Sequence, residues 1–310
     1  MKKIRIGFFK KSQGIFTEKL IAEIENELRS LPNVELFTGL DFRLAYIKNG
    51  RAIIGDFDLN TLDVYFWHDT IKPADWGSDN YALNVLRALE NDCIVINSSI
   101  STQIVNDKYL AHTTLKKQGL PVADFALVDA SNKAALSAIF NSFDSSILIK
   151  PRFGGWGAGI VKIDSLNALF DQVDLLLSFS PKQNLQILLE KYYPNDLSRW
   201  ISVVVFGDKV LFGYKKNVIR ENDWKICDPE KTDGKGFLSE YVDPSPELKK
   251  IALAAKQAIG KDIVCFDFIY TSEGYKIVDE NGRPGLYAHC LEKAGVDIKK
   301  EIISLIMSKL

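Results

Sequence analysis

The sequence is short of the residues that build covalent and metal frameworks. Its 310 residues include only four cysteines and three histidines. No two cysteines have the Cys-x-x-Cys spacing, which argues against a zinc site or a disulfide scaffold. They lie mostly within apolar runs, so we expect buried free thiols and a reducing compartment. These cysteines are Cys93, Cys227, Cys265 and Cys290.

Neither sign of charge dominates, and long apolar runs are missing. Lys and Arg number 39 against 40 Asp and Glu, for a net charge of -1, which argues against a nucleic-acid partner or an anionic membrane surface. The longest apolar run, residues 201–206, is far shorter than a membrane span, and the N-terminus resembles neither a signal peptide nor an anchor. We therefore expect a cytoplasmic protein, with homo-oligomerisation left open.

Length and periodicity predict several domains, the first built on a parallel sheet. A chain of 310 residues exceeds the usual size of one domain. Helix-like segments alternate with strand-like ones, which lie at 4–9, 34–37, 63–67 and 93–97. Such alternation predicts β-α-β units and an open α/β sheet, whose ligand crevice lies at the carboxyl ends of the strands. His68 follows one such strand and is a candidate substrate contact.

The pattern changes after Asn97. A polar bridge over residues 98–106 leads into a helix, and short strands around a further helix then indicate a small α+β unit. From Leu185 onward the chain reads as mostly antiparallel strands. We therefore expect a mixed α/β and α+β fold in three parts: a Rossmann-like substrate domain at 1–98, a central subdomain at 99–184 and a C-terminal subdomain at 185–310.

Four glycines lie close together between two strand-like runs. They are Gly154, Gly155, Gly157 and Gly159. A dinucleotide-binding loop leads from a strand into a helix, whereas this loop leads into another strand, which predicts the tip of a β-hairpin. Glycines let backbone N–H groups approach phosphate oxygens closely, and Lys150, just before them, is placed to reach a nucleotide phosphate. A plain surface hairpin is the alternative interpretation.

Three oxygen-bearing side chains are expected to meet near the C-terminal end. Asp267 interrupts an apolar strand, where an unpaired carboxylate is costly. Asp279 and Asn281 are two residues apart, so they project from one face of the next strand. A turn at 271–274 brings Asp267 opposite Val278 or Asp279. Such a set suits Mg²⁺, and a solvated acidic turn is the alternative.

Four segments in this order resemble the ATP-grasp enzymes, and most of all the group that contains the ribosomal protein S6 glutamate ligase and the bacterial glutathione synthetases. The segments are Asn106-Asp107-Lys108, Ile149-Lys150-Pro151 with the glycine loop, Leu189-Glu190-Lys191-Tyr192-Tyr193, and residues 279–286. Their order and spacing carry the resemblance, which covers nearly the whole chain. It implies the ATP-grasp fold with an N-terminal Rossmann-like domain, and ATP and Mg²⁺ as cofactors.

The resemblance also implies roles for individual residues. Lys108 and Lys150 would bind nucleotide phosphates and the adenine edge, and the glycine loop would cover the triphosphate. The hinge that meets adenine and ribose falls on Glu190, Lys191, Tyr192 and Tyr193. The Mg²⁺ ligand positions fall on Asp267, Asp279 and Asn281.

The chain departs from the family at two places. Asp279 stands where the family commonly has Glu, so the number of metal ions stays open. Residues 200–202 stand where the ligase group usually has an Asp-x-Arg step, and Arg199 is nearby but out of register. We therefore expect substrate recognition to differ from that of the best-known members. Glu280 is expected to face away from the metal.

The function that these features predict is ligation of a carboxylate to an amine. In the family, ATP phosphorylates the carboxylate to an acylphosphate, which the amine attacks to form an amide. Arg283 follows the metal strand and is a candidate for holding the acylphosphate or the carboxylate. Lys216 and Arg220 lie where the second substrate should enter. The expected partners are small molecules, an amino acid or a short peptide.

Two other functions stay open at this point. An NAD(P)-dependent oxidoreductase would use the first domain, although the segment from Gly7 to Gly14 lacks the G-x-G-x-x-G spacing. The second is a regulatory ATP-binding protein without ligase chemistry, against which the intact metal positions argue.

Overall fold

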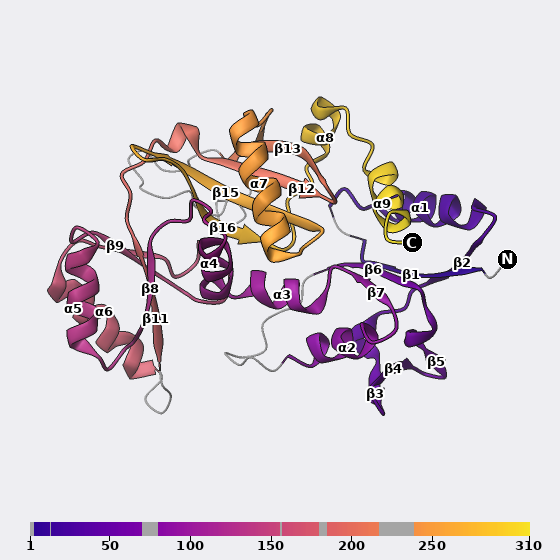
Figure 1. The fold of residues 1–310 in the computed structure, drawn as a ribbon, viewed down its shortest axis with the longest axis horizontal. Helices are drawn as coiled ribbons and strands as arrows, with labels where there is room; N and C mark the ends of the chain where they lie inside the picture. The colour runs from indigo at the N-terminus through magenta and orange to yellow at the C-terminus, as the bar shows by residue number, and fades with distance from the viewer. Residues whose placement is uncertain (1–2, 13, 70–79, 156, 180–184, 217–238) are drawn as a thin grey trace.

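The computed structural model describes residues 3–12, 14–69, 80–155, 157–179, 185–216 and 239–310. Within these ranges the chain forms three units, each built around its own main sheet (Figure 1). The N-terminal unit, indigo to purple in Figure 1, lies beside the C-terminal sheet, and the central unit lies at the other end of the molecule.

A four-stranded parallel sheet forms the N-terminal unit, in the order β2-β1-β6-β7. Its strands are β1 (Ile4–Lys10), β2 (Val34–Thr38), β6 (Val64–His68) and β7 (Ile94–Ile96), and the crossover helices are α1 (Glu18–Ser30) and α2 (Tyr81–Leu89). Every residue of β6 is buried, as is typical of parallel strands covered on both faces. The predicted open α/β sheet is confirmed.

A small antiparallel sheet fills the connection between β2 and β6. Its elements are η1 (Phe42–Leu44), β3 (Tyr46–Lys48), β4 (Arg51–Ile54), β5 (Phe57–Asp58) and η2 (Leu59–Thr61). Asn60 ties this insertion to α2, because its buried amide nitrogen donates to the Ala88 carbonyl at 2.7 Å. Sequence analysis does not predict these strands, since two to four residues are too few to show a period.

Two consecutive helices follow the first sheet. α3 (Ser99–Asn106) stands where the sequence predicts a polar bridge, and α4 (Lys108–Lys117) matches the predicted helix. The bridge prediction is wrong because Ser98 caps α3, accepting from the Ser101 backbone N–H, and the helix buries small polar side chains that lack an apolar signature. Asp107 caps α4.

The central unit is an antiparallel sheet in the order β10-β9-β11-β8, with two helices packed against it. Its elements are β8 (Phe125–Asp129), α5 (Lys133–Ser142), β9 (Ile147–Lys150), β10 (Val161–Ile163), α6 (Leu166–Phe179) and β11 (Gln186–Lys191). β9 and β10 pair antiparallel on either side of the glycine loop. The predicted hairpin is confirmed.

The C-terminal unit is a five-stranded antiparallel sheet in the order β14-β13-β12-β15-β16. Its strands are β12 (Ile201–Phe206), β13 (Lys209–Lys216), β14 (Ser239–Val242), β15 (Ile263–Thr271) and β16 (Gly274–Asn281). Its helices are η3 (Leu197–Arg199), α7 (Pro246–Ile259), α8 (Ala288–Ala294) and α9 (Ile298–Met307). A turn joins β15 to β16, and the predicted metal site depends on the register of these two strands.

The last helix joins the two ends of the chain. α9 packs beside α1 (Figure 1), and its Leu305 shares one hydrophobic core with Phe8 of β1 and Phe212 of β13. The N-terminal sheet is therefore fixed to the C-terminal unit by burial of apolar surface.

The predicted spans 99–184 and 185–310 each place one segment in a unit to which it does not belong. β11 pairs with both β8 and β9 and so belongs to the central sheet. α4 packs on the C-terminal sheet, where Leu115 shares a core with Ile277 of β16. Long-range pairing decides both placements, and no local pattern in the sequence encodes it.

The described residues bear on two expectations from composition. Cys93, Cys265 and Cys290 are buried free thiols, as predicted, while Cys227 lies outside the described residues. No helix in the described ranges is both long enough and apolar enough to cross a membrane.

Replacement of Leu305 by alanine tests the contact between α9 and the N-terminal unit. Leu305 is 5% exposed, so its truncation should lower the free energy of unfolding by about 2–4 kcal/mol. Leu44→Ala makes the same chemical change at a side chain that is 74% exposed, and should cost less than about 0.5 kcal/mol. Urea denaturation followed by tryptophan fluorescence measures both, and equal losses would contradict the packing described.

Candidate active site

A cavity of about 1000 Å³ lies where the three units meet. Most predicted site residues line it: Lys108, Lys150, Gly154, Gly155, Gly157, Glu190, Lys191, Tyr192, Tyr193, Lys216, Asp267, Asp279, Asn281 and Arg283. Gly159 is not among the lining residues. A Cβ there would lie 2.8 Å from Pro151 Cγ, so packing accounts for that glycine. Arg220 lies outside the described residues.

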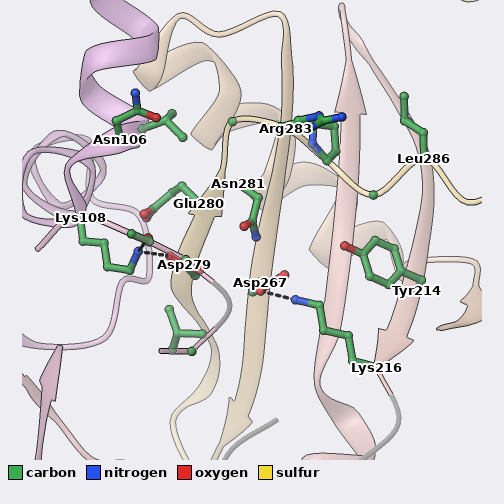
Figure 2. Close-up of a pocket in the computed structure, with 18 of the residues that line it drawn as sticks. Asn106, Lys108, Tyr214, Lys216, Asp267, Asp279, Glu280, Asn281, Arg283 and Leu286 are labelled. Atoms are coloured by element: carbon green, nitrogen blue, oxygen red, sulfur yellow. Dashed lines mark hydrogen bonds and ion pairs between the residues drawn. The ribbon is translucent and has the colours of Figure 1, made fainter. Parts of the chain in front are cut away.

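The two predicted metal carboxylates stand opposite each other on neighbouring strands. Asp267 of β15 aligns with Asp279 of β16, so their side chains share one face of the sheet. Asn281 projects from the same face and Glu280 from the opposite one. Figure 2 shows Glu280 extending away from Asn281 and Asp267. The expected register is observed, whereas the metal role stays a prediction.

Lysine ammonium groups neutralise both carboxylates. Lys216 Nζ donates to Asp267 Oδ2 at 2.7 Å, while Ser202 donates to Oδ1 at 2.5 Å. Lys108 Nζ lies 3.2 Å from Asp279 Oδ1, and both ion pairs are drawn in Figure 2. Burial opposes the charged form of each lysine, but Asp267 raises the pKa of Lys216 and Asp279 raises the pKa of Lys108. Both lysines are therefore cations at neutral pH.

The donor set fits a hard divalent cation. Asp279 Oδ1 is buried and accepts no hydrogen bond, so beside its ion pair it keeps a lone pair for coordination. Among the residues that the structure describes, no three His, Cys, Asp or Glu side chains cluster as metal ligands. The predicted set therefore reaches three oxygens only through the Asn281 amide. A site with a small number of protein ligands suits Mg²⁺, because the ion keeps its remaining coordination positions for water and substrate phosphates.

Lys108 also ties the glycine loop to β16. Its Nζ donates to the Gly154 carbonyl at 2.7 Å, so one ammonium group joins the loop to Asp279. Arg152, near the start of the loop, makes two hydrogen bonds to Asp107 at 2.8 and 2.6 Å. The φ angle of Gly154 is 110°, which residues with a Cβ rarely adopt. These contacts hold the backbone of the loop at the cavity wall, and Gly154 places no side chain there.

A buried charge cluster stands behind the predicted adenine hinge. Glu190 Oε1 lies 2.6 Å from Lys150 Nζ, and Glu190 Oε2 lies 3.3 Å from His112 Nε2. The other ring nitrogen of His112 is 3.6 Å from Glu280. Burial raises the pKa of Glu280 to about 7, whereas Lys150 and His112 lower the pKa of Glu190 in spite of its burial. Lys150 also donates to the Val278 carbonyl at 3.1 Å, which fixes its ammonium group between the hinge and β16.

Sequence reasoning missed His112, because its carboxylate partners lie on distant strands. The one available signal is its place on α4, four residues after Lys108, which puts both side chains on one helical face. That spacing by itself does not distinguish a site residue from a core histidine.

The polar groups of some predicted site residues are bound to other side chains. Lys191 Nζ pairs with Asp144 at 2.7 Å, and the Tyr193 hydroxyl donates to Asp124 at 2.8 Å. The hinge therefore offers the cavity its backbone and aromatic surface at these two positions. Arg199 stacks on the Tyr270 ring, 3.1 Å from its centre, and is not among the lining residues.

The residues expected to meet the second substrate are only partly where the sequence places them. Arg283 lines the cavity, in the loop that follows β16 (Figure 2). Lys216 also lines the cavity, where its ammonium group is bound to Asp267. Residue alternation along β13 explains this, because it turns Lys216 toward the carboxylate of β15.

Lys261 is a further basic residue of the cavity wall. It is 1% exposed, and its Nζ donates to Thr102 Oγ1 at 3.0 Å. It lies against Gly282, where an added Cβ would be 3.2 Å from Lys261 Cε. Burial lowers the pKa of Lys261 to about 7, which Asp262 offsets only in part.

Comparison with known proteins gives four similarities. Residues 105–306 match the RimK-like ATP-grasp domain. The chain is 26% identical to the tetrahydromethanopterin:alpha-L-glutamate ligase of Methanocaldococcus jannaschii, over 84% of this chain and 82% of that protein. It is 26% identical to the glutamate–LysW ligase ArgX of Sulfolobus acidocaldarius, over 68% and 72%. Its fold matches D-alanyl-alanine synthetase A from Vibrio cholerae with a TM-score of 0.65 at 13% identity, over 100% and 99% of the two chains.

Lys261→Met should stabilise the protein in a pH-dependent way. The pKa of Lys261 is about 7 in the folded protein, against an ordinary lysine value of 10.5. Unfolding therefore takes up a proton between these two pH values, and the stability of the wild type rises with pH there. Below about pH 7 the buried ammonium carries its full penalty. One pKa unit corresponds to about 1.4 kcal/mol, so the penalty amounts to several kcal/mol. The hydrogen bond to Thr102 offsets about 1 kcal/mol of it.

Thermal denaturation of both proteins at about pH 6.5 and about pH 9 measures the effect. The variant should unfold at the higher temperature, and its advantage should shrink at the higher pH. An advantage that does not change with pH would contradict the assignment.

Proposed function

The chain belongs to the RimK-like ATP-grasp family of carboxylate–amine ligases, and we propose that it uses ATP and Mg²⁺ to join a carboxylate to the amine of an amino acid or short peptide. The family match covers more than half of the chain, so the predicted resemblance is confirmed. Both relatives named above are glutamate ligases. The comparisons support neither the oxidoreductase nor the non-catalytic alternative.

The nucleotide is assigned to the part of the cavity between the central unit and β16. Lys108 and Lys150 are held there by Asp279 and Glu190, and ammonium groups are suited to phosphate oxygens. The glycine loop adds backbone N–H groups that can approach phosphate without steric hindrance. Adenine would then lie against the hinge at residues 190–193.

The proposed reaction has two steps. An oxygen of the substrate carboxylate attacks the γ-phosphorus of ATP, and the bond to the β-phosphate oxygen breaks to release ADP. The amine then attacks the carbonyl carbon of the acylphosphate, the C–N bond forms, phosphate leaves with its bridging oxygen, and the nitrogen loses a proton to phosphate or water. Mg²⁺, when bound, neutralises phosphate charge.

The protein contributes position and charge rather than a nucleophile. Asp267, Asp279 and Asn281 would hold the metal. Lys216, bound to Asp267, and Arg283, two residues after Asn281, line the same cavity and can balance the negative charge of the transferring group. Such preorganised charges need no rearrangement of solvent during the reaction.

One observation carries the proposal: three buried or half-buried lysines meet two carboxylates of neighbouring strands in one cavity. Lys108 and Lys150 are at most 8% exposed, and buried charges are costly unless they are needed and paired. A folded core does not require them there, whereas a metal-bound triphosphate requires both signs of charge together.

Asp279→Asn should abolish most ligase turnover while leaving the fold intact, because it removes a metal-binding charge. We expect a loss of roughly 100-fold or more, as for other groups that stabilise transition-state charge. The measurement is ADP release from Mg-ATP in the presence of paired amino-acid and dipeptide substrates, with thermal denaturation as the check on folding. Glu280→Gln is the comparison variant: it makes the same change at a second carboxylate of the cavity, one that residue alternation turns away from Asp267 and Asn281, and it should keep most of the activity.

Two results would count against the proposal in different ways. If Glu280→Gln lost turnover and Asp279→Asn kept it, the metal assignment on β16 would be wrong. If wild type released no ADP with any substrate pair, and Mg-ATP did not raise its melting temperature, the ligase assignment itself would fail.

A further inference from the structure

His112 is a buried histidine of α4 that stands between carboxylates of two different units. It is 1% exposed. Its Nε2 lies 3.3 Å from Glu190 of β11, in the central unit, and its Nδ1 lies 3.6 Å from Glu280 of β16, in the C-terminal unit. The Phe125 ring packs nearly perpendicular to the imidazole, with ring centres 5.4 Å apart. These contacts hold the imidazole at the boundary of the two units, and His112 itself is not among the residues that line the cavity.

Both nitrogens of this imidazole face groups that accept hydrogen bonds. Nδ1 lies 2.8 Å from the carbonyl oxygen of Lys108, which can only accept, so Nδ1 carries a proton. Nε2 faces the carboxylate of Glu190, which also only accepts when it is ionised. Burial opposes the charged form of His112, but Glu280 and Glu190 raise its pKa. The surroundings of the ring therefore fit an imidazolium with a proton on each nitrogen.

The two oxygens of the Glu190 carboxylate have different cationic partners. Oε1 lies 2.6 Å from Lys150 Nζ, and Oε2 lies 3.3 Å from His112 Nε2. Glu190 is 2% exposed, and a carboxylate buried to this extent needs its charge balanced by partners within the protein. Here the balance is shared between Lys150, which lines the cavity, and His112, which does not.

This sharing leaves Lys150 with a donor for the cavity. An ammonium group has three N–H donors, and Lys150 uses one on Glu190 and another on the Val278 carbonyl. The third can be donated to a ligand in the cavity that Lys150 lines. Without His112, more of the negative charge of Glu190 would act on Lys150 alone. The ammonium group would then be held more tightly by Glu190 and would attract an anionic ligand less strongly.

We propose that His112 is a positioning residue for nucleotide binding: it holds one oxygen of Glu190 and so keeps Lys150 available to a phosphate oxygen. The inference rests on the proposed function and adds to it a residue outside the cavity lining. Because His112 acts through Glu190, its effect on binding depends on the charge of Glu190. The effect is also larger for a ligand that carries phosphates than for one that does not, since Lys150 is the group that gains from it.

Isothermal titration calorimetry on the full chain tests the proposal with two probes. One is a non-hydrolysable ATP analogue with Mg²⁺, and the other is adenosine, which lacks phosphates and is measured by displacement of the analogue. The variants are His112→Gln, Glu190→Gln and the double variant, with thermal denaturation as the check on folding. His112→Asn is the alternative neutral variant should the first not fold, with the same expected result.

Lys117→Gln is the matched control. It makes the same change to a neutral amide at another cation of α4, but Lys117 is exposed and is not among the residues that line the cavity.

His112→Gln should weaken binding of the ATP analogue by about tenfold or more, as loss of one partner of a desolvated charge pair does. It should change the binding of adenosine much less, because adenosine has no phosphate for Lys150 to contact. In the Glu190→Gln background the same substitution should have little effect on the analogue, because no carboxylate is left there for His112 to hold. Lys117→Gln should bind both probes nearly as wild type does.

An equal loss of analogue binding on His112→Gln with and without the Glu190 carboxylate would overturn the proposal, because the loss would then come from the packing of α4. Equal weakening of analogue and adenosine would overturn it too, and so would analogue binding as tight in His112→Gln as in Lys117→Gln. In these cases wild type still binds the analogue, and the ligase assignment stands. Failure of wild type to bind the analogue at all would overturn the proposed function and this inference with it.

Discussion

Buried ion pairs between different elements are the constraint on which the cavity depends. Lys108 at the start of α4 holds Asp279 of β16 and the Gly154 carbonyl of the glycine loop. Lys150 of β9 holds Glu190 of β11. A buried charge that loses its partner costs about 3–5 kcal/mol, so neither lysine can move without a new partner. The same two ammonium groups also donate to carbonyls across the boundary, Lys108 to Gly154 and Lys150 to Val278, and so fix the central unit against the C-terminal sheet.

The same pairs explain how the cavity can accept highly charged ligands. We expect phosphate oxygens to replace the carboxylates as partners of Lys108 and Lys216, and a hard cation to replace the lysines at Asp267 and Asp279. Opposite charges then stay in contact before and after binding, so no buried charge is left without a partner. The N-terminal sheet, fixed by α9, completes the cavity with Lys10, the last residue of β1.

Local patterns predicted the parts of the site that lie close together in sequence. The glycine hairpin follows from strand alternation and a short turn. The same reasoning left Asp267 opposite Val278 or Asp279, and a register shift between Asp267 and Phe268 aligns it with Asp279. Contacts between distant elements left no such pattern, and for that reason His112 and Lys10 were not recognised as part of the site. For the same reason the sequence analysis assigned β11 to the C-terminal part. Its pairing partners depend on the other strands of the sheet and not on its own residues.

A crystal structure of the full chain with Mg²⁺ and a non-hydrolysable ATP analogue tests the central claim most directly. The account predicts the metal bound by Asp267 and Asp279, with Lys108 and Lys216 contacting phosphate oxygens instead of those carboxylates. Nucleotide and metal bound elsewhere, or bound here with both lysine–carboxylate pairs unchanged, would contradict it.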